Sequence, residues 1–398
     1  MLVLAFLFLA SYPITSTDAT QNATSDTLIY GWVSTNCGRG TGEILRSCLF
    51  TIFLCIWTVL HRPVPRYEGP RAHSFRTKIV RSKTVPAIIV LIAPELLIFT
   101  AVRDFQDAMQ RRKGLRDLGC REFTLTHGFF FDMGGFCLKT SEPRYHQLQL
   151  RDIDRTAKPQ SEEWFDELRN ISENRIKDSA TSDNIAKSLA CLQVVWLANQ
   201  VVSRLAHHQA VTLLEVSTMA YVMCALIAYG FWWNRPQNCA IPVIVDCSDG
   251  AMDKMSPSKY GVREGTMFEF ICSGQHWIHE NELIGMWKYA LLFVLAPSVF
   301  GAVHIASWDI PHPTDIELWL WRGSIVACLV IPILFALVVY LQATVILNHG
   351  LSVACMHILV LVYILVRTYM LVEDFLSLRA LPSSVFDTVK WSSFVPHI

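Results

Sequence analysis

Long apolar runs separated by polar and charged segments dominate the hydrophobic pattern of this chain. A helix rises about 1.5 Å per residue, so a run of about 20 residues crosses the hydrocarbon of a bilayer. About seven such runs occur, at roughly 43–60, 85–102, 184–205, 210–233, 284–306, 318–347 and 351–371. The pattern therefore predicts an all-α, polytopic membrane protein with about seven transmembrane helices.

The composition agrees with this fold class. Hydrophobic residues make up 52% of the 398 residues and charged residues only 17%, which is more apolar than a typical soluble domain. Basic and acidic residues number 34 each, so a nucleic-acid partner has no electrostatic support. Residues 1–20 hold an apolar segment too short to span a membrane and are interpreted as a signal peptide, with a retained hydrophobic N-terminus as the alternative. Residues 21–398 then form a single integral membrane domain with long extramembrane loops at about 103–185 and 234–284.

The third and fourth runs form a helical hairpin that carries the first candidate site. Gln193, Trp196, Gln200 and Arg204 follow one another at helical spacing and are expected on one face, as substrate-binding residues. Glu215 lies just inside the next helix, at a depth where we expect an ion pair with Arg204. A charge within a membrane span costs about 2.5–3.5 kcal/mol and usually faces a cavity or a partner.

Two further acidic residues are candidates outside this hairpin. Glu95 follows Pro94 in the middle of the second run, where it is either a catalytic acid or a residue bonded to a neighbouring helix at a kink. Asp132 lies with His127 in an aromatic segment at 126–136, which either dips into the membrane, caps a cavity or is a packing element.

The distribution of charges and cysteines predicts the orientation. Basic residues crowd the loop at 62–83, which is therefore expected in the cytosol. A lumenal N-terminus then places the glycosylation sequons at Asn22 and Asn170 on the lumenal side, together with six cysteines outside the spans. Those cysteines are Cys37, Cys120, Cys137, Cys239, Cys247 and Cys272. The basic residues at 111–116 disagree with this topology, and a re-entrant second segment, with six spans in total, is the alternative.

Motifs for nucleotides and metals are weak. The glycines at 38–42 are not preceded by a strand or followed by Lys-Ser/Thr, so a turn before the first helix is expected there. The HWIHE sequence at 276–280 has no further histidines at ligand spacing, and we expect no metal. No cofactor is expected.

Several sequence blocks resemble a family of fungal multi-pass membrane proteins. They read CGRGTGEILRSCLFTIFLCIWTVLH at 37–61, FFFDMGGF at 129–136, DSATSDNIAKSLACLQVVW at 178–196, SRLAHHQAVTLLE at 203–215 and FWWNRPQNCAIP at 231–242. The chain departs from the family at 180–183, where Ala-Thr-Ser-Asp replaces a Lys-Gly-Asp run, and at 234–236, where Asn-Arg-Pro replaces Lys-Pro. Some members are understood as integral membrane terpene cyclases of meroterpenoid biosynthesis. The resemblance thus implies a lipophilic prenylated substrate and a location in the endoplasmic reticulum or another endomembrane.

The residues restrict how such a cyclase would act. The sequence has no aspartate-rich run to hold magnesium around a diphosphate, so cyclisation must begin by protonating an alkene or epoxide. This chemistry needs a protonated carboxyl group, a dry cavity and aromatic faces for the cation. We expect Glu95, Glu215 and Asp132 as candidate acids, with Glu95 and Glu215 facing one shared, water-poor chamber. The alternatives are a proton-coupled transporter and a receptor-like or structural seven-helix protein.

Overall fold

The computed structural model places most of the helices and their connections. It describes residues 27–34, 39–61, 64, 75–141, 145–148, 162–180, 184–206, 209–237, 239, 241–248, 283–344 and 348–387, without the side chains of residues 75–83, 184–187, 283–290 and 343. The expected signal peptide, the sequon at Asn22 and the HWIHE sequence lie outside these residues.

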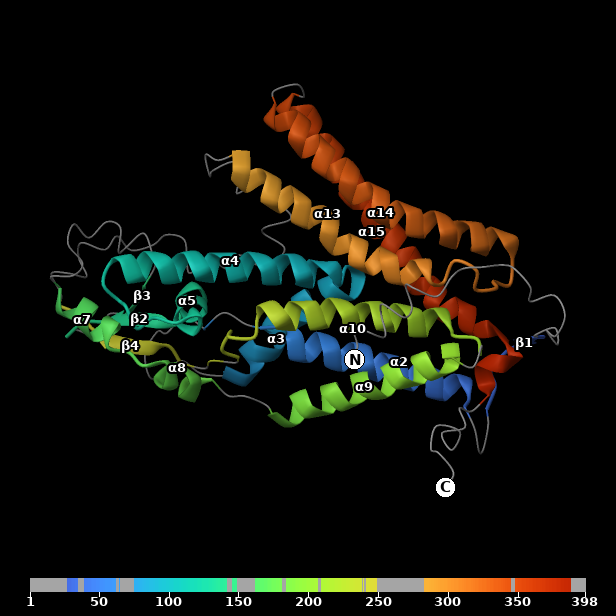
Figure 1. The fold of residues 1–398 in the computed structure, drawn as a ribbon, viewed down its shortest axis with the longest axis horizontal. Coiled ribbons are helices and arrows are strands. Elements are labelled where there is room, and N and C mark those ends of the chain that lie inside the picture. Colours follow the sequence, from blue (N-terminus) through green and yellow to red (C-terminus); the bar gives the residue numbers. More distant parts are fainter. Residues whose placement is uncertain are drawn as a thin grey trace.

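Long helices make up most of the described chain, which confirms the all-α class (Figure 1). They are α2 (Thr41–Val59), α3 (Phe75–Ile92), α4 (Glu95–Asp117), α9 (Asn184–Ala206), α10 (Leu213–Phe231), α13 (Leu283–Ile305), α14 (Asp315–Ala343) and α15 (His349–Leu376). Within the described residues, five helices are long and apolar enough to cross a membrane, or six if α3 and α4 count as one broken span. The expected number of seven is not reached there, because the described apolar part of α13 is shorter than a span.

The second apolar run does not form the single helix expected over 85–102. Its two halves, α3 and α4, meet at a bend of 119°. Pro94 explains the break, because proline has no N–H to donate and its ring clashes with the preceding turn. Side chains from distant helices satisfy two of the freed carbonyls: the Tyr221 hydroxyl donates to Leu91, and Arg367 Nε donates to Ile92 at 2.9 Å. The prediction of one continuous helix is therefore wrong, and the bend agrees with the re-entrant alternative.

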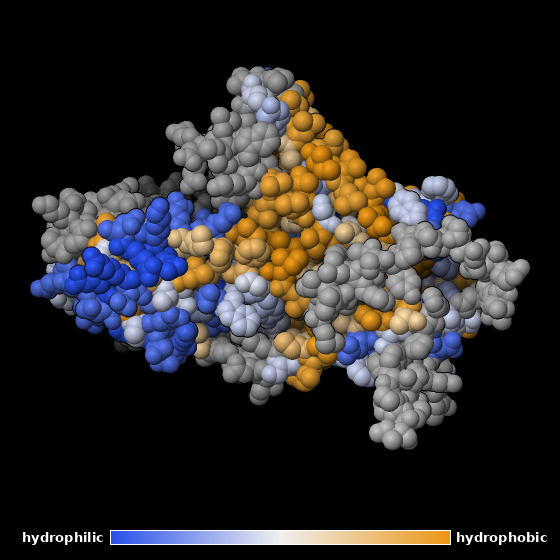
Figure 2. Space-filling view, in the orientation of Figure 1, coloured by the Kyte–Doolittle hydropathy of each residue, from blue (hydrophilic) through white to orange (hydrophobic). Residues whose placement is uncertain are grey.

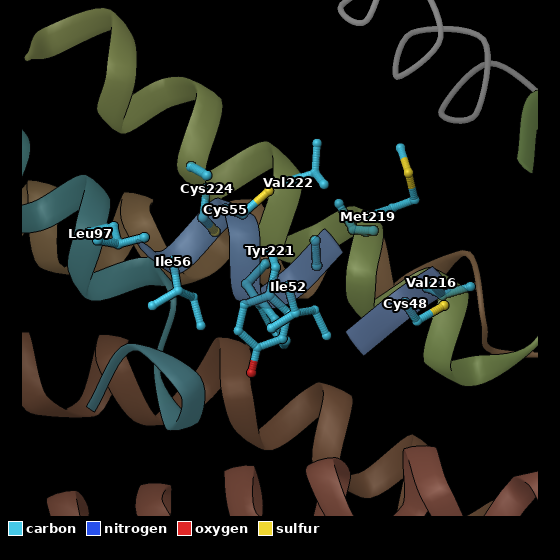
Figure 3. Packing of buried hydrophobic residues seen from close by; sticks show 14 of the residues in the cluster. Cys48, Ile52, Cys55, Ile56, Leu97, Val216, Met219, Tyr221, Val222 and Cys224 are labelled. Carbon is cyan, nitrogen blue, oxygen red and sulfur yellow. The ribbon is translucent and has the colours of Figure 1, made fainter. Parts of the chain in front are cut away.

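Helix α10 forms the centre of the bundle. Residues Thr212 and Glu215 form a capping box at its start, which explains why the helix begins there. Its faces contact α2, α4 and α13, and 78% of its apolar window is buried. Ala220, Cys224 and Ala228, each fully buried, repeat at four-residue spacing and let neighbouring helices approach closely. Figure 3 shows side chains from α2, α4 and α10 meeting in this core.

Helices α14 and α15 are much less covered. Only 28% of the apolar window of α14 and 6% of that of α15 are buried. Their outward side chains are large and aliphatic, and Ile358, Leu361 and Leu365 are each about 60% exposed. A continuous apolar surface results, visible as the orange area in Figure 2.

A small α/β cap covers one end of the bundle. It contains α5 (Leu125–Asp132), β2 (Phe136–Lys139), β3 (Tyr145–Gln147), α7 (Glu163–Arg169), α8 (Glu173–Ser179) and β4 (Val243–Asp246). The three strands pair in the order β3-β2-β4, with β2 and β4 parallel. The cap has its own hydrophobic core, which includes Phe130, Phe131 and Phe136 of the aromatic segment at 126–136, whereas Phe129 packs into the core of the bundle. Phe130 and Phe136, for example, meet edge to face at 5.1 Å. Of the three possibilities for this segment, the structure supports the packing element.

The bundle has two distinct ends. At the cap end, Val64 after α2 donates to Met133 at 2.9 Å, and Arg235 after α10 forms an ion pair with Asp104 of α4. At the opposite end, β1 (Leu28–Tyr30) pairs antiparallel with β5 (Ala380–Pro382), next to η3 (Ser377–Arg379) and η4 (Ser383–Phe386). The start of α2, the turn between α9 and α10 and the end of α15 therefore meet far from the cap (Figure 1).

Candidate functional site

The polar face of α9 lines a cavity at the end opposite the cap. Gln193, Trp196, Gln200 and Arg204 lie along this cavity as their spacing predicts, and Glu215 joins them from α10. The cavity measures about 840 Å³, and we call it the polar cavity. Its remaining lining residues come mostly from α2: Arg39, Glu43, Ile44, Arg46, Ser47, Cys48, Phe50, Leu197 and Asp387. The role of the α9 residues in binding stays a prediction.

Glu215 is buried and fully engaged. Its Oε2 accepts hydrogen bonds from the backbone N–H and the hydroxyl of Thr212, each at 3.0 Å. Its Oε1 accepts from Arg39, with which it forms an ion pair. The carboxylate also lies in the first turn of α10, where the helix dipole favours a negative charge. A carboxylate held in this way is an acceptor of hydrogen bonds rather than a proton donor.

The ion pair expected between Arg204 and Glu215 is replaced by other contacts. Arg204 donates Nε to the carbonyl of Ala210 at 3.0 Å and Nη1 to that of Asp387 at 3.0 Å. Its Nη2 donates to the carbonyls of Ser384 and Val385, at 2.7 and 2.9 Å. Backbone carbonyls of the turn between α9 and α10 and of the segment around η4 thus take the guanidinium donors. Arg204 ties η4 to the turn between α9 and α10, and Arg39 is left to pair with Glu215.

The walls of the polar cavity are amphipathic. Gln193 Nε2 donates to the Thr51 hydroxyl at 3.0 Å, which joins α9 to α2 inside the bundle. Trp196 and Phe50, on the other hand, are 49% and 48% exposed. The lining of the cavity therefore combines charged and amide groups with large apolar side chains.

Glu95 lies in a different cavity, which we call the Glu95 cavity. It measures about 310 Å³ and lies between the α3–α4 break and helices α13, α14 and α15. The Tyr363 hydroxyl donates to Glu95 Oε1, and Arg367 Nη2 lies 3.9 Å from Oε2. Glu215 does not line this cavity, and Glu95 does not line the polar cavity. The expectation of one chamber shared by both acids is therefore wrong for the described residues. The break at Pro94 accounts for this, because it directs Glu95 towards the C-terminal helices.

Asp132 lies in the cap, at the far end of the bundle from the polar cavity. Arg111 Nε is 3.6 Å from its Oδ1. Burial raises the pKa of Asp132, the neighbouring Asp104 raises it further, and Arg111 opposes the shift. The nearby His127 is structural: the Thr124 N–H donates to its Nδ1 at 3.2 Å, and its Nε2 donates to the Ile171 carbonyl at 3.0 Å. Burial lowers the pKa of His127, which keeps its ring neutral.

A buried polar chain that the sequence did not indicate connects three helices. The Ser217 hydroxyl of α10 lies 2.8 Å from Asp374 Oδ1 of α15 and 3.0 Å from His304 Nε2 of α13. His304 Nδ1 donates to the Phe300 carbonyl at 2.9 Å, so a neutral ring has only an acceptor at Nε2. One hydroxyl proton cannot serve both neighbours. The chain is satisfied only if one further proton sits on Asp374 or on His304.

The cap contains cysteines and one of the two sequons. Cys120, Cys137 and Cys239 are buried free thiols, and Cys247 is buried as well. Asn170 ends α7 on the exposed surface. Within the described ranges, no group of three His, Cys, Asp or Glu side chains is placed to hold a metal ion.

The comparisons with known proteins identify a family without a function. The chain belongs to a family of unknown function (DUF8562), whose model matches residues 3–258 and 266–398. Neither a curated protein nor a solved structure matches the chain significantly.

Proposed function

We propose that this member of the DUF8562 family is an integral membrane protein with six transmembrane helices and one re-entrant helical pair, α3–α4. The spans are α2, α9, α10, α14 and α15, together with α13, which is counted as a span because the whole helix has 23 residues. The exposed apolar surface of α14 and α15 supports the proposal, because a continuous surface of large aliphatic side chains is unfavourable in water and favourable in lipid. The bend of 119° supports the re-entrant pair, because α3 and α4 then both reach the cap end.

The orientation proposed here places the cap in the cytosol. A re-entrant α3–α4 pair brings the basic residues at 62–83 and 111–116 to the same side, which removes the conflict between them. The buried free thiols of Cys120, Cys137 and Cys239 in the cap agree with a reducing compartment. Both ends of the chain then lie in the lumen of an endomembrane such as the endoplasmic reticulum. In this proposal Asn22 is available for glycosylation and Asn170 is not.

The function supported best is the binding of an amphiphilic small molecule in the polar cavity. The observation that carries it is the convergence of Gln193, Gln200, Arg39 and Glu215 on a cavity that also exposes Trp196. A volume of about 840 Å³ lies within the range of small-molecule sites. A polar head group would meet the charged and amide groups, and an apolar chain would extend along the exposed aromatic side chains towards lipid.

The resemblance of the sequence to the fungal membrane proteins suggests a specific reaction at the polar cavity. We propose a metal-independent cyclisation of the prenyl chain of a meroterpenoid. Glu215 is paired with Arg39 and is therefore suited to accept the proton that the final carbocation loses. The proton that starts the reaction requires another donor. The reaction is an isomerisation, because one proton enters and one leaves.

A proton-coupled transporter is the second candidate, favoured by the Asp374–Ser217–His304 chain. This chain holds one proton that either end can carry, deep within the bundle. Buried ionisable groups of this kind form proton relays in membrane carriers.

Microsomes containing the full chain, supplied with linear prenylated phenols, test the cyclase. A new product of unchanged mass is expected, and it should be lost in Glu215→Gln and Gln200→Ala. Leu361→Ala, on the lipid-facing side of α15, is the matched control and should retain activity. Binding without any product would refute the cyclase. Solute uptake driven by a proton gradient would support the transporter instead.

A further inference from the structure

The Glu95 cavity has the composition of a site for a molecule dissolved in lipid. Its lining is almost wholly aliphatic and aromatic, with Phe99, Phe293 and Phe335 contributing rings. One of its lining residues, Ile364, is 42% exposed on the apolar outer surface of α15. At about 310 Å³, it reaches the lower end of the range of ligand sites.

One acceptor in this apolar space lacks a hydrogen bond. Glu95 is 2% exposed. Its Oε1 accepts a hydrogen bond from the Tyr363 hydroxyl, whereas its Oε2 has no hydrogen-bond partner among the residues that the structure describes. Arg367 Nη2 is 3.9 Å from Oε2, close enough for electrostatic attraction but too far for a hydrogen bond. A buried acceptor without a donor is unfavourable, so this oxygen provides a directional preference for a ligand that donates.

The charge of the site selects the type of donor. Arg367 already supplies the countercharge of Glu95. It is fixed by its bond to the Ile92 carbonyl and by the Phe300 ring, whose centre lies 3.5 Å from the guanidinium carbon. An ammonium ligand would leave an excess positive charge in an apolar cavity. A neutral hydroxyl group supplies the donor without adding charge.

The break between α3 and α4 explains how a carboxylate comes to lie there. Pro94 ends the first helix inside the bundle, and Glu95 begins the second. A carboxylate in the first turn of a helix is stabilised by the dipole. The broken pair therefore presents one carboxylate acceptor to a cavity that α13, α14 and α15 line mostly with apolar side chains.

We propose that the Glu95 cavity binds a lipid-soluble alcohol, with its apolar body between α4, α13 and α15 and its hydroxyl group donating to Glu95 Oε2. The inference requires the membrane location proposed above. It requires neither the polar cavity nor the cyclase reaction.

Photolabelling of the full chain in lipid nanodiscs tests this binding site. The probe is a long-chain alcohol with a diazirine in its tail, and the comparison is its methyl ether, which has the same shape but no donor. We expect the alcohol to label peptides of α4, α13 or α15, with about tenfold weaker labelling by the ether, as expected for loss of one hydrogen bond to a charged group. Equal labelling by both probes would overturn the proposal. Preference for the corresponding amine would also overturn it.

Three variants complete the test. Glu95→Gln should narrow the difference in labelling between the alcohol and the ether, because the glutamine amide can donate a hydrogen bond to the oxygen of either probe. Leu359→Trp should fill the cavity and abolish labelling by both probes. Gln200→Ala, in the polar cavity, should leave labelling unchanged, which separates this site from the proposed function. If Glu95→Gln does not fold, the comparison of the two probes on the unaltered chain still decides whether the hydroxyl group is needed for binding.

Discussion

Replacement of Arg204 by methionine should release the C-terminal segment without unfolding the bundle. Arg204 donates four hydrogen bonds to the carbonyls of Ala210, Ser384, Val385 and Asp387. Methionine retains the apolar part of the side chain and removes every donor. The carbonyls on η4 would then need water, so the segment should open locally while the buried helices remain folded.

Three of these hydrogen bonds, to Ser384, Val385 and Asp387, set the size of the effect, because the bond to Ala210 does not hold the C-terminal segment. At about 1 kcal/mol net for each bond, their loss amounts to about 3 kcal/mol, or about a hundredfold in the equilibrium for local opening. The antiparallel pairing of β1 with β5 holds the same segment at a second place. Opening should therefore be greatest at 383–387 and smaller at 380–382.

Hydrogen exchange followed by mass spectrometry measures this opening directly. Peptides covering 380–387 should exchange much faster in Arg204→Met than in the unaltered chain, and peptides from α10 should not change. Arg46→Met, which alters an exposed arginine of the same cavity, is the matched control and should show no difference at 380–387. Unchanged exchange at 380–387 in Arg204→Met would refute the role assigned to the three hydrogen bonds that hold this segment.

Three other predictions address the cap, the orientation and the buried polar chain. Because burial lowers the pKa of His127, only the unfolded chain takes up a proton as the pH falls through about 6.5, so the stability of the cap should fall below that pH. The decrease of the thermal unfolding temperature with falling pH should be smaller in His127→Gln. An identical decrease in both chains would contradict this explanation. If the cap faces the cytosol, a glycan should be lost in Asn22→Gln and unaffected in Asn170→Gln; a glycan on Asn170 would reverse the orientation. Asp374→Asn should unfold close to the temperature of the unaltered chain, because the new amide can donate a hydrogen bond to the Ser217 hydroxyl. Asp374→Leu should lower the free energy of unfolding by about 1–3 kcal/mol, because it leaves the buried Ser217 hydroxyl without that hydrogen bond. Equal stability of these two variants would contradict the requirement for an extra proton.

The helical spacing of polar and apolar residues correctly predicted the features that depend on a single helix. The polar face of α9 follows from the spacing of Gln193, Trp196, Gln200 and Arg204, and all four line one cavity. The apolar runs likewise predicted the all-α class. These signals are local, so one chain is sufficient to read them.

Contacts between distant segments could not be predicted in the same way. Arg39 pairs with Glu215 across 176 positions, and no spacing along the chain indicates this. Pro94 did signal a break, yet the apolar residues on either side of it favoured a continuous span. The cap strands contain three or four residues each, too few to show an alternating pattern.

The parallel pairing of β2 with β4 has a consequence for how the protein is made. Phe136 is aligned with Val243, and the whole α9–α10 hairpin lies between them in the sequence. During synthesis, β2 of the cap therefore cannot pair with β4 until the α9–α10 hairpin has left the ribosome and entered the bilayer. Closing such a long loop is slow. A nascent chain stalled before β4 should therefore expose the unpaired edge of β2 to chaperones, and the cap cannot be expressed alone as one continuous fragment.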